Sequence, residues 1–198
     1  MMTVEVFTDR ALADRQALAQ VLLTDLLSAD EAPESVMVGA REFIHVLVHE
    51  PTVWATGGAA GPPRYLVRVT VPGSWNTKEF ATFVVPKVTD IVASFEDDPT
   101  RLRREPHCVV QITGLREHSV GTLGQPTTST EITRLMTENF RSSGERVSAP
   151  DGSVVDPVCG MIVELATTPF TLTHDGTTYG FCAPSCRKVF AEDLGVPA

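Results

Sequence analysis

The first 140 residues of the chain repeat one pattern, strand–helix–strand, and this repeat limits the possible folds more than any other feature. In the first unit, apolar residues alternate over 4–8, recur with a helical period over 11–27 and form an almost unbroken run over 43–48. Residues 28–35 are mostly polar and include a proline, which predicts a loop. The first unit is therefore predicted to contain two strands joined by one helix.

The second unit follows the same order. Apolar and β-branched residues dominate 65–71 and 108–112, which predicts two more strands. Between them, Asn76 and Glu79 have the spacing of a helix capping box, and the helix that they open contains Pro86. Because proline lacks a backbone donor, we expect Pro86 to kink or interrupt this helix.

The two units also share residues at matching positions. At a constant offset of 67 positions, Glu50, Thr52, Val53 and Gly57 correspond to Glu117, Ser119, Val120 and Gly124.

A strand–helix–strand unit places its strands parallel and its helix across one face of the sheet. Two such units predict an α/β (α+β) fold, in which a four-stranded sheet carries both helices on one face. The other face of the sheet would be bare although 43–48 is apolar, so we expect a homo-oligomer that covers it.

Three of the four cysteines lie in the last forty residues, at a spacing that indicates metal binding. Cys159 is followed by twenty-two residues, Cys182, three residues and Cys186. Thiolates are preferred ligands of Zn(II) and Cu(I). The second and third cysteines also flank the start of a predicted helix at 184–193, whose N-terminal dipole favours thiolates. We therefore expect the three thiols to bind Cu(I) or Zn(II).

Three thiols leave one position of a tetrahedral site unfilled. His174 and Asp156 are the nearest candidates in the sequence for a fourth ligand. Cys108 and His107 are candidates only if the N-terminal and C-terminal parts of the chain dock against each other. A three-coordinate site and an open fourth position are the remaining alternatives.

The segment 141–152 is small, polar and ends in Pro-Asp-Gly, which predicts a linker between domains. We therefore expect a domain of two fused strand–helix–strand units at 1–140, the linker at 141–152 and a small cysteine-rich metal-binding domain at 153–198. A core of some 45 residues is too small to be stable without a metal or a comparable crosslink, which agrees with the proposed metal site.

The residues around the cysteines form a motif. Residues 156–161 read Asp-Pro-Val-Cys-Gly-Met, and Phe181 opens the run Phe-Cys-x-x-x-Cys. Over about 153–194 the chain resembles the YHS domain, a small metal-associated module. The resemblance implies that the three clustered cysteines are the ligands. Gly180 departs from the pattern, because an aromatic residue usually stands there.

A second resemblance covers about 1–140. Residues 49–58, His-Glu-Pro-Thr-Val-Trp-Ala-Thr-Gly-Gly, and residues 12–16 are similar to the tautomerase superfamily typified by 4-oxalocrotonate tautomerase. The resemblance implies trimers with inward-facing sheets and an N-terminal proline as general base. The chain begins Met-Met-Thr instead, and Pro63 is internal, where its nitrogen is an amide. If translation began at Met2 and that Met were removed, Thr3 would carry a free α-amine, which is the alternative base.

Five residues of the N-terminal part are candidates for binding a small carboxylate. Arginine can bind a carboxylate through two parallel hydrogen bonds, and a tryptophan can line the pocket. The alternative roles are surface ion pairs for the arginines and a core or subunit contact for the tryptophan. The candidates are Arg41, Arg64, Arg68, Arg116 and Trp54.

The composition excludes several classes of partner. The net charge is −9 and the largest basic cluster is 101–104, which argues against binding to nucleic acid or to an anionic membrane. No apolar run approaches the roughly 18 residues of a membrane helix, and the N-terminus has no signal-peptide core. We therefore expect a cytoplasmic protein with reduced thiols.

These features favour a metal-binding protein whose thiolate site is carried on an oligomeric, tautomerase-like scaffold, with a small-molecule pocket. One alternative is a tautomerase-type isomerase or lyase that acts on a small keto or unsaturated carboxylic acid. The missing N-terminal proline counts against it. Another alternative is a structural zinc module for assembly.

Overall fold

The computed structural model describes residues 1–27, 32–58 and 61–197, and its N-terminal part is built on one four-stranded sheet. The sheet has the order β2-β1-β3-β4, with parallel pairs at both edges and an antiparallel pair at the centre. The predicted α+β fold is confirmed. The strands are β1 (Met2–Thr8), β2 (Ile44–His49), β3 (Tyr65–Pro72) and β4 (Cys108–Leu115).

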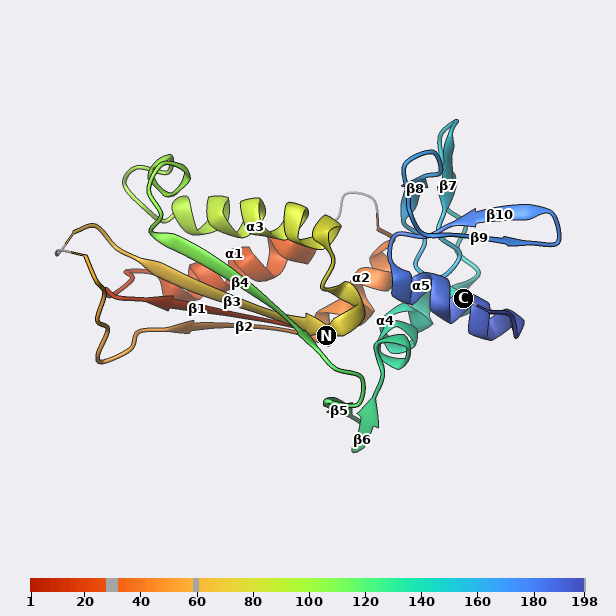
Figure 1. Cartoon of the computed structure of the whole chain (residues 1–198), viewed down its shortest axis with the longest axis horizontal. Coiled ribbons are helices and arrows are strands. Elements are labelled where there is room, and N and C mark those ends of the chain that lie inside the picture. Colours follow the sequence, from red (N-terminus) through yellow and green to blue (C-terminus); the bar gives the residue numbers. More distant parts are fainter. Residues whose placement is uncertain (28–31, 59–60, 198) are drawn as a thin grey trace.

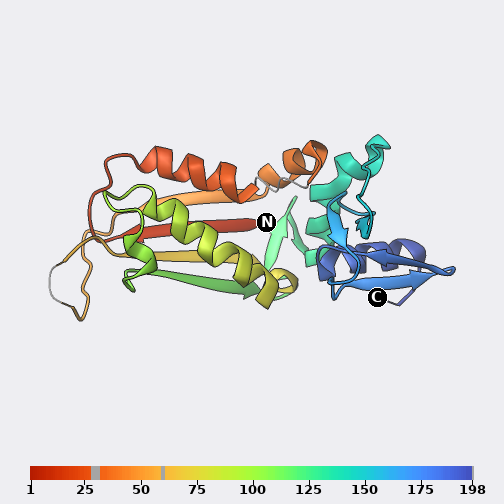
Figure 2. The ribbon, with the colours of Figure 1, turned by 90° about the horizontal axis from the view of Figure 1, so that it is seen from above.

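The long helices α1 (Arg15–Leu27) and α3 (Lys78–Ala93) both lie on one face of this sheet (Figures 1 and 2). Alternate residues of β1 and β3 point toward the helices, as the two-residue period of a strand requires. The helices turn their apolar sides toward these residues. The fully buried core of this layer includes Val4, Val6, Val67, Val69, Leu18, Leu22, Val84, Val88 and Val92.

The helix α1 begins at Arg15, four residues later than the predicted start. Asp14 precedes it, and its Oδ1 accepts a hydrogen bond from the Ala17 backbone N–H at 2.8 Å. A carboxylate in this position satisfies a donor that the first helical turn leaves free. Asp9, five residues earlier, does not cap α1, because its carboxylate accepts from the backbone N–H of Arg64 at 3.0 Å.

The helix α3 differs from its prediction at two points. Its cap is Thr77, whose Oγ1 accepts from the Phe80 backbone N–H at 3.2 Å, so the predicted Asn76 cap was one residue early. Pro86 lies inside α3, which continues to its end without interruption. The valines two residues on either side of Pro86 are fully buried. Their packing offsets the hydrogen bond that proline removes.

The helix α2 (Glu34–Arg41) was not predicted. It begins within the predicted loop 28–35, of which 28–31 lie outside the described residues. Gly39 of α2 lies against α4 (Ser129–Ser143), where a Cβ atom would be 2.3 Å from the Met136 carbonyl oxygen. Eight residues span only about two turns, so a helical period is hard to recognise in the sequence.

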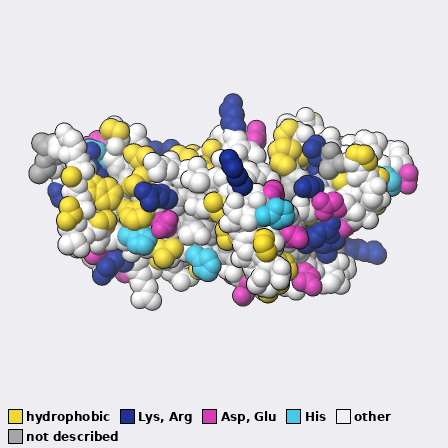
Figure 3. Space-filling view, turned by 60° about the horizontal axis from the view of Figure 1, so that its bottom comes forward, with side chains coloured by type: hydrophobic (Ala, Val, Ile, Leu, Met, Phe, Trp, Pro, Cys, Tyr) yellow, Lys and Arg dark blue, Asp and Glu magenta, His cyan; other side chains and the backbone are white. Residues whose placement is uncertain are grey.

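The face of the sheet opposite the helices is open. Leu47 of β2 and Val109 of β4 are 41% and 49% exposed. Phe7 stacks on His49 with ring centroids 4.5 Å apart, and the guanidinium carbon of Arg68 lies 5.1 Å from the centroid of the Phe7 ring. Hydrophobic side chains lie beside histidine and basic side chains on this side of the molecule (Figure 3). A single chain therefore leaves this face of the edge strand β2 uncovered, as the sequence predicts, and the oligomer expected to cover it stays a prediction.

The C-terminal part contains short hairpins and two helices. The helix predicted at 184–193 is α5 (Pro184–Leu194), and the other helix of this part is α4. Among the described residues, no helix combines the length and the apolar character needed to cross a bilayer. The strands of this part are β5 (Val120–Thr122), β6 (Gln125–Thr127), β7 (Ser153–Val155), β8 (Ile162–Glu164), β9 (Thr171–His174) and β10 (Thr177–Gly180).

The cysteine-rich region packs against α2 and α4. Val36 of α2 and Phe140 of α4 belong to the same buried cluster as Phe181. Gly160 has a φ angle of +71°, and a Cβ atom there would lie 2.6 Å from the Phe140 ring. Both the backbone conformation and the close approach require glycine. The two parts of the chain therefore share a core.

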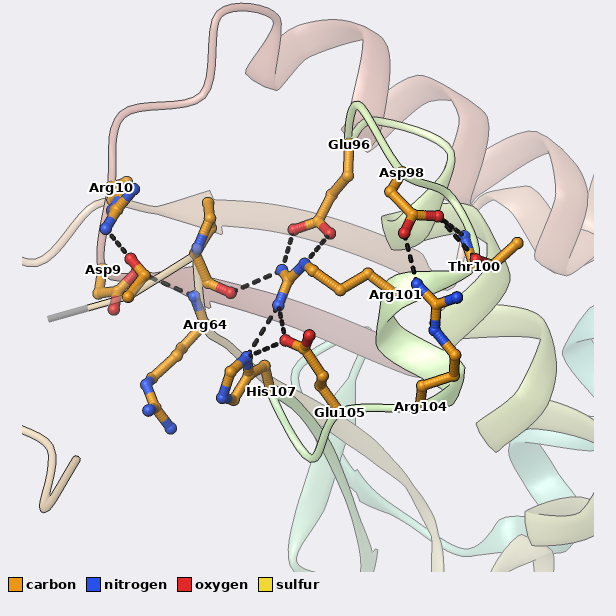
Figure 4. A network of polar contacts seen from close by, with 12 residues as sticks. Asp9, Arg10, Arg64, Glu96, Asp98, Thr100, Arg101, Arg104, Glu105 and His107 are labelled. Carbon is orange, nitrogen blue, oxygen red and sulfur yellow. Dashed lines mark hydrogen bonds and ion pairs between the residues drawn. The ribbon is translucent and has the colours of Figure 1, made fainter. Parts of the chain in front are cut away.

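A buried ion-pair network lies where β3 and β4 begin (Figure 4). Its centre is Arg101, in the short 3-10 helix η2 (Arg101–Arg103). The guanidinium donates from Nε to Glu96 Oε2 at 2.6 Å and from Nη1 to His107 Nδ1 at 2.8 Å. It also donates from Nη2 to the Pro63 carbonyl oxygen at 2.8 Å, which joins η2 to the segment before β3.

Candidate metal centre

Cys159 lies in the turn between β7 and β8. Two backbone hydrogen bonds close this turn: Asp156 N–H donates to Met161 O, and Gly160 N–H donates to Asp156 O, both at 2.8 Å. The left-handed conformation of Gly160 lets the chain reverse directly after the cysteine. The run Asp-Pro-Val-Cys-Gly-Met thus forms a closed loop with a fixed cysteine.

Cys182 and Cys186 lie at the start of α5. Pro184 is the first residue of this helix, a position that tolerates proline because its missing donor would have no partner there. Cys182 precedes the helix by two residues, and Cys186 lies in its first turn. The helix dipole favours negative charge at this end. The structure therefore brings together all three cysteines that the sequence singled out.

The three sulfur atoms lie close together as free thiols. Cys182 Sγ is 3.4 Å from Cys159 Sγ and 3.7 Å from Cys186 Sγ. A tetrahedral zinc site with Zn–S bonds of about 2.3 Å separates its sulfurs by about 3.8 Å. With a carboxylate oxygen of Asp156, the three sulfurs form a group whose members are all within 4.8 Å of one another. This donor set fits a thiophilic metal ion.

Asp156 connects the two cysteine loops. Its Oδ1 accepts from the Val158 N–H and its Oδ2 from the Cys182 N–H, each at 2.9 Å. The residue is fully buried, and this burial, with the nearby Cys159, raises the pKa of its carboxyl group to about 7. Each carboxylate oxygen keeps a further lone pair. Asp156 therefore both fixes the position of Cys182 and offers a fourth ligand atom.

The thiols differ in acidity because they interact with one another. Hydrogen bonds from Cys182 and Cys186 lower the pKa of Cys159 well below that of an ordinary thiol. The interaction with Cys159 raises the pKa of Cys182 and of Cys186 well above that of an ordinary thiol. The three thiols therefore behave as one interacting group rather than as three independent acids.

Cys182 is the accessible member of the cluster. Cys159 and Cys186 are buried, whereas Cys182 is half-buried and lines a cavity of about 590 Å³. The cavity lies between α3 and the cysteine-rich region, and its lining is mainly apolar. Its walls include Trp75, Phe80 and Phe83 from the N-terminal part, and Met161 and Phe170 from the C-terminal part.

The other candidates for a fourth ligand lie outside the cluster. Within the described residues, the only group of mutually close metal-binding atoms contains Asp156 and lacks His174. His174 ends β9, and its Nε2 lies 3.3 Å from Asp175 Oδ2. His107 belongs to the Arg101 network, and burial raises the pKa of the Cys108 thiol to about 11.

The proposed carboxylate-binding residues are dispersed. Arg41 ends α2 and pairs with Glu34 at 2.5 Å, while Arg68 lies over Phe7 on the open sheet face. Thr3 lies inside β1 in register with Thr70, so its nitrogen is a strand amide. Arg64 precedes β3, Arg116 follows β4, and Trp54 lies between β2 and β3; none of the five candidates lines the cavity beside Cys182.

The sequence did not identify Trp75 as part of the site. It ends the 3-10 helix η1 (Gly73–Trp75), and its indole Nε1–H donates to Ser185 Oγ of α5 at 3.2 Å. Trp75 also lines the cavity beside Cys182. Because this contact joins residues 110 positions apart, no local pattern in the sequence indicates it.

Comparisons with known proteins give similarities to solved structures alone. No model of a protein family matches the chain, and no curated protein matches it. Macrophage migration inhibitory factor from Oncomelania hupensis is 14% identical, with 63% of this chain and 96% of that chain covered and a TM-score of 0.48. A fused 4-OT wild-type asymmetric trimer is 21% identical, with coverage of 63% and 94% and a TM-score of 0.47. N1, a member of the cis-3-chloroacrylic acid dehalogenase family, is 20% identical, with coverage of 65% and 87% and a TM-score of 0.47.

Proposed function

We propose that the protein binds one thiophilic metal ion per chain, Zn(II) or Cu(I), through Cys159, Cys182 and Cys186. The convergence of three sulfur atoms from two separate loops supports this function most strongly. Buried cysteines that serve only as small apolar residues have no need to direct their sulfurs to one point. The resemblance of 153–194 to the YHS domain assigns the same three ligands.

The role of Asp156 should differ between Zn(II) and Cu(I). Its carboxylate oxygen is the donor nearest to the three sulfurs and would complete a tetrahedral Cys3Asp site. Zn(II) accepts carboxylate oxygen, whereas Cu(I) prefers soft sulfur ligands and is satisfied by three thiolates. Replacement of Asp156 by asparagine would therefore weaken Zn(II) binding more than Cu(I) binding.

The cavity beside Cys182 would give another molecule access to the bound metal. A small, largely apolar molecule in this cavity would lie next to Cys182, the one cysteine of the site that is not fully buried. An exposed side of a metal site serves either transfer of the metal to another molecule or binding of a ligand to the metal. Both activities are compatible with a soft ion held by three thiolates, and the cavity favours ligand binding.

A metal titration of the reduced protein tests the proposed function. Zn(II) and Cu(I) would be added in the presence of a competing chelator, and bound metal and released protons would be measured together. We expect saturation at one ion per chain, with release of protons, because thiols must lose their protons to become ligands. The proposal would be contradicted if the reduced protein bound no metal, or if alkylation of the thiols left metal binding unchanged.

The open sheet face supports the proposed assembly. We propose that residues 1–140 form an oligomeric, trimeric scaffold, that 141–152 link it to the metal-binding part at 153–198, and that the open faces pack together. Exposed Leu47 and Val109 on this face would be covered by a second copy of the chain. The resemblance to the tautomerase superfamily implies the same inward packing.

Leu47→Glu should dissociate this assembly. A buried carboxylate without a partner is costly, so we expect the trimer mass of the wild-type chain to fall to that of one chain. Sedimentation velocity measures the change. Val53→Glu introduces the same charge at a position that is already 84% exposed, and it should leave the mass unchanged. A wild-type protein that sediments as a monomer would contradict the proposed assembly.

A tautomerase-type enzyme is the second candidate function, favoured by the resemblance of 1–140 to that superfamily. Assay of enolisable keto acids and unsaturated acids tests it. Turnover that survives serine substitution at all three clustered cysteines would place the activity in the N-terminal part and contradict a metal-centred function.

A structural zinc module is the third candidate. The observation in its favour is that Cys159 and Cys186 belong to the buried cluster that also contains Val36 and Phe140. Chelation would then unfold 153–197 and loosen its contact with α4. A chelated protein that keeps its fold, followed by amide hydrogen exchange, would favour a working metal site instead.

A further inference from the structure

A smaller cavity lies where η1, α4 and α5 meet. Its volume is about 230 Å³, below the roughly 300–1,000 Å³ of typical small-molecule pockets. The first residues of α4, Ser129 and Thr130, and those of α5, Pro184 and Ser185, line it. The cavity is therefore sized for a small ion or group and is bounded by two helix N-termini.

Unpaired polar atoms are concentrated in this cavity. Among the described residues, four buried side-chain nitrogen or oxygen atoms lack a hydrogen-bond partner. Ser74 Oγ, Thr130 Oγ1 and Arg187 Nε are three of them, and all three residues line this cavity. The fourth, His49 Nε2, is on β2 and lies 3.4 Å from a carboxylate oxygen of Glu5.

Thr130 is the clearest of the three unpaired groups, because the residue is only 3% exposed. Buried hydroxyl groups are almost always hydrogen-bonded, so three unpaired groups around one space indicate a polar occupant. The hydroxyl groups and the guanidinium N–H can all donate. An occupant that accepts hydrogen bonds on several sides would satisfy them together.

The charges around the cavity favour an anion. Arg187 and Lys188 contribute two cations, and the helices α4 and α5 direct the positive ends of their dipoles toward it. The cap residue of α5 is Ala183, whose side chain satisfies none of the free donors of the first turn. Glu117 is the one acidic residue of the lining, and its Oε2 already accepts from the Ser129 N–H at 2.7 Å.

We propose that this cavity binds a tetrahedral oxyanion, as free inorganic phosphate or as the terminal phosphoryl group of a small metabolite. Thr130, Ser74 and Arg187 donate to the oxyanion, and Lys188 supplies the second positive charge. This oxyanion site shares no ligand residue with the metal centre. It touches the same helix, because Ser185 and Arg187 flank Cys186.

Trp75 provides a direct signal for binding. Its Nε1–H donates to Ser185 Oγ, and Ser185 lines the cavity. The chain has two tryptophans, so a Trp54→Phe background leaves Trp75 as the sole indole fluorophore. An anion that hydrogen-bonds at the start of α5 should change the emission of Trp75.

The test is a titration of the full chain with sodium phosphate at constant ionic strength, with chloride as the balancing anion. We expect a saturable change in Trp75 emission and a rise in the thermal unfolding midpoint. Arg187→Gln should weaken phosphate binding by tenfold or more. Arg146→Gln removes the same charge from an exposed residue beyond α4 and should leave binding unchanged.

Thr130→Val keeps the shape of the side chain and removes the unpaired hydroxyl. In phosphate-free buffer it should raise the unfolding midpoint, and in phosphate it should lose most of the phosphate-dependent rise. Glycerol phosphate distinguishes the two sources: binding equal to that of inorganic phosphate supports a metabolite phosphoryl group, and binding of phosphate alone supports the free ion. Equal responses to phosphate and chloride, or an unchanged response in both Arg187→Gln and Thr130→Val, would overturn the proposal.

Discussion

Replacement of Cys186 by serine should reduce the affinity for Zn(II) or Cu(I) by more than about 100-fold. Loss of a residue that only supports a metal ligand already costs about 10–100-fold, and Cys186 contributes a sulfur atom directly to the cluster. Serine has nearly the same shape, but its hydroxyl is a poor ligand for a soft ion. Competition with a chelator of known affinity measures the change.

Cys108→Ser is the matched control for this substitution. Cys108 is the remaining cysteine of the chain and lies on β4. It is outside the group of close metal-binding atoms among the described residues. Its substitution should leave metal affinity unchanged. If Cys108→Ser and Cys186→Ser weakened binding equally, or if Cys186→Ser bound metal as tightly as the wild-type protein, the three-thiol site would be wrong.

The second large effect is on stability and concerns Arg101. We expect Arg101→Met to lower the free energy of unfolding by about 3–5 kcal/mol, the cost of breaking a buried ion pair by removal of one partner. Glu96 has a side chain that is only 6% exposed, so it would keep a buried charge without its partner. The Pro63 carbonyl oxygen would also lose its donor. Chemical denaturation monitored by circular dichroism measures the difference.

Arg103→Met tests whether burial causes this effect. Arg103 is two residues away and pairs with Asp90, but the two side chains are 50% and 56% exposed. Exposed pairs contribute at most about 1 kcal/mol, so this substitution should be nearly neutral. Adding Glu96→Leu to Arg101→Met should restore part of the lost stability, because it removes the one deeply buried carboxylate that has lost its partner. Equal losses in the two single arginine variants would contradict a buried network.

Period and spacing were sufficient to predict the sheet and both long helices. In each long element the spacing of apolar residues repeats several times, as in the alternation of Val4 and Val6. The residues that this spacing assigns to the core are the ones that are buried. The short helix α2 was missed because its position depends on contact with α4 through Gly39, a contact far away in the sequence. The start of α1 was misplaced for a different reason: several acidic and hydroxyl residues precede this helix, and any of them could serve as its cap.

The candidate site was predictable in its three cysteines but not in its surroundings. The spacing of the cysteines pointed to Cys159, Cys182 and Cys186, and the structure places their sulfurs together. Sequence distance could not choose between His174 and Asp156, because that choice depends on how the β7–β8 turn faces α5. The cavity beside Cys182 draws half of its walls from around α3, more than 90 positions earlier in the chain.

The metal content of the reduced protein, purified without added metal, tests the proposed thiolate site most directly. Elemental analysis by mass spectrometry, with the protein concentration from amino-acid analysis, gives the number of ions per chain. We expect close to one Zn or Cu per chain in the wild-type protein and in Cys108→Ser, and none in Cys186→Ser. A fully reduced, folded wild-type protein that carries no metal would contradict the site.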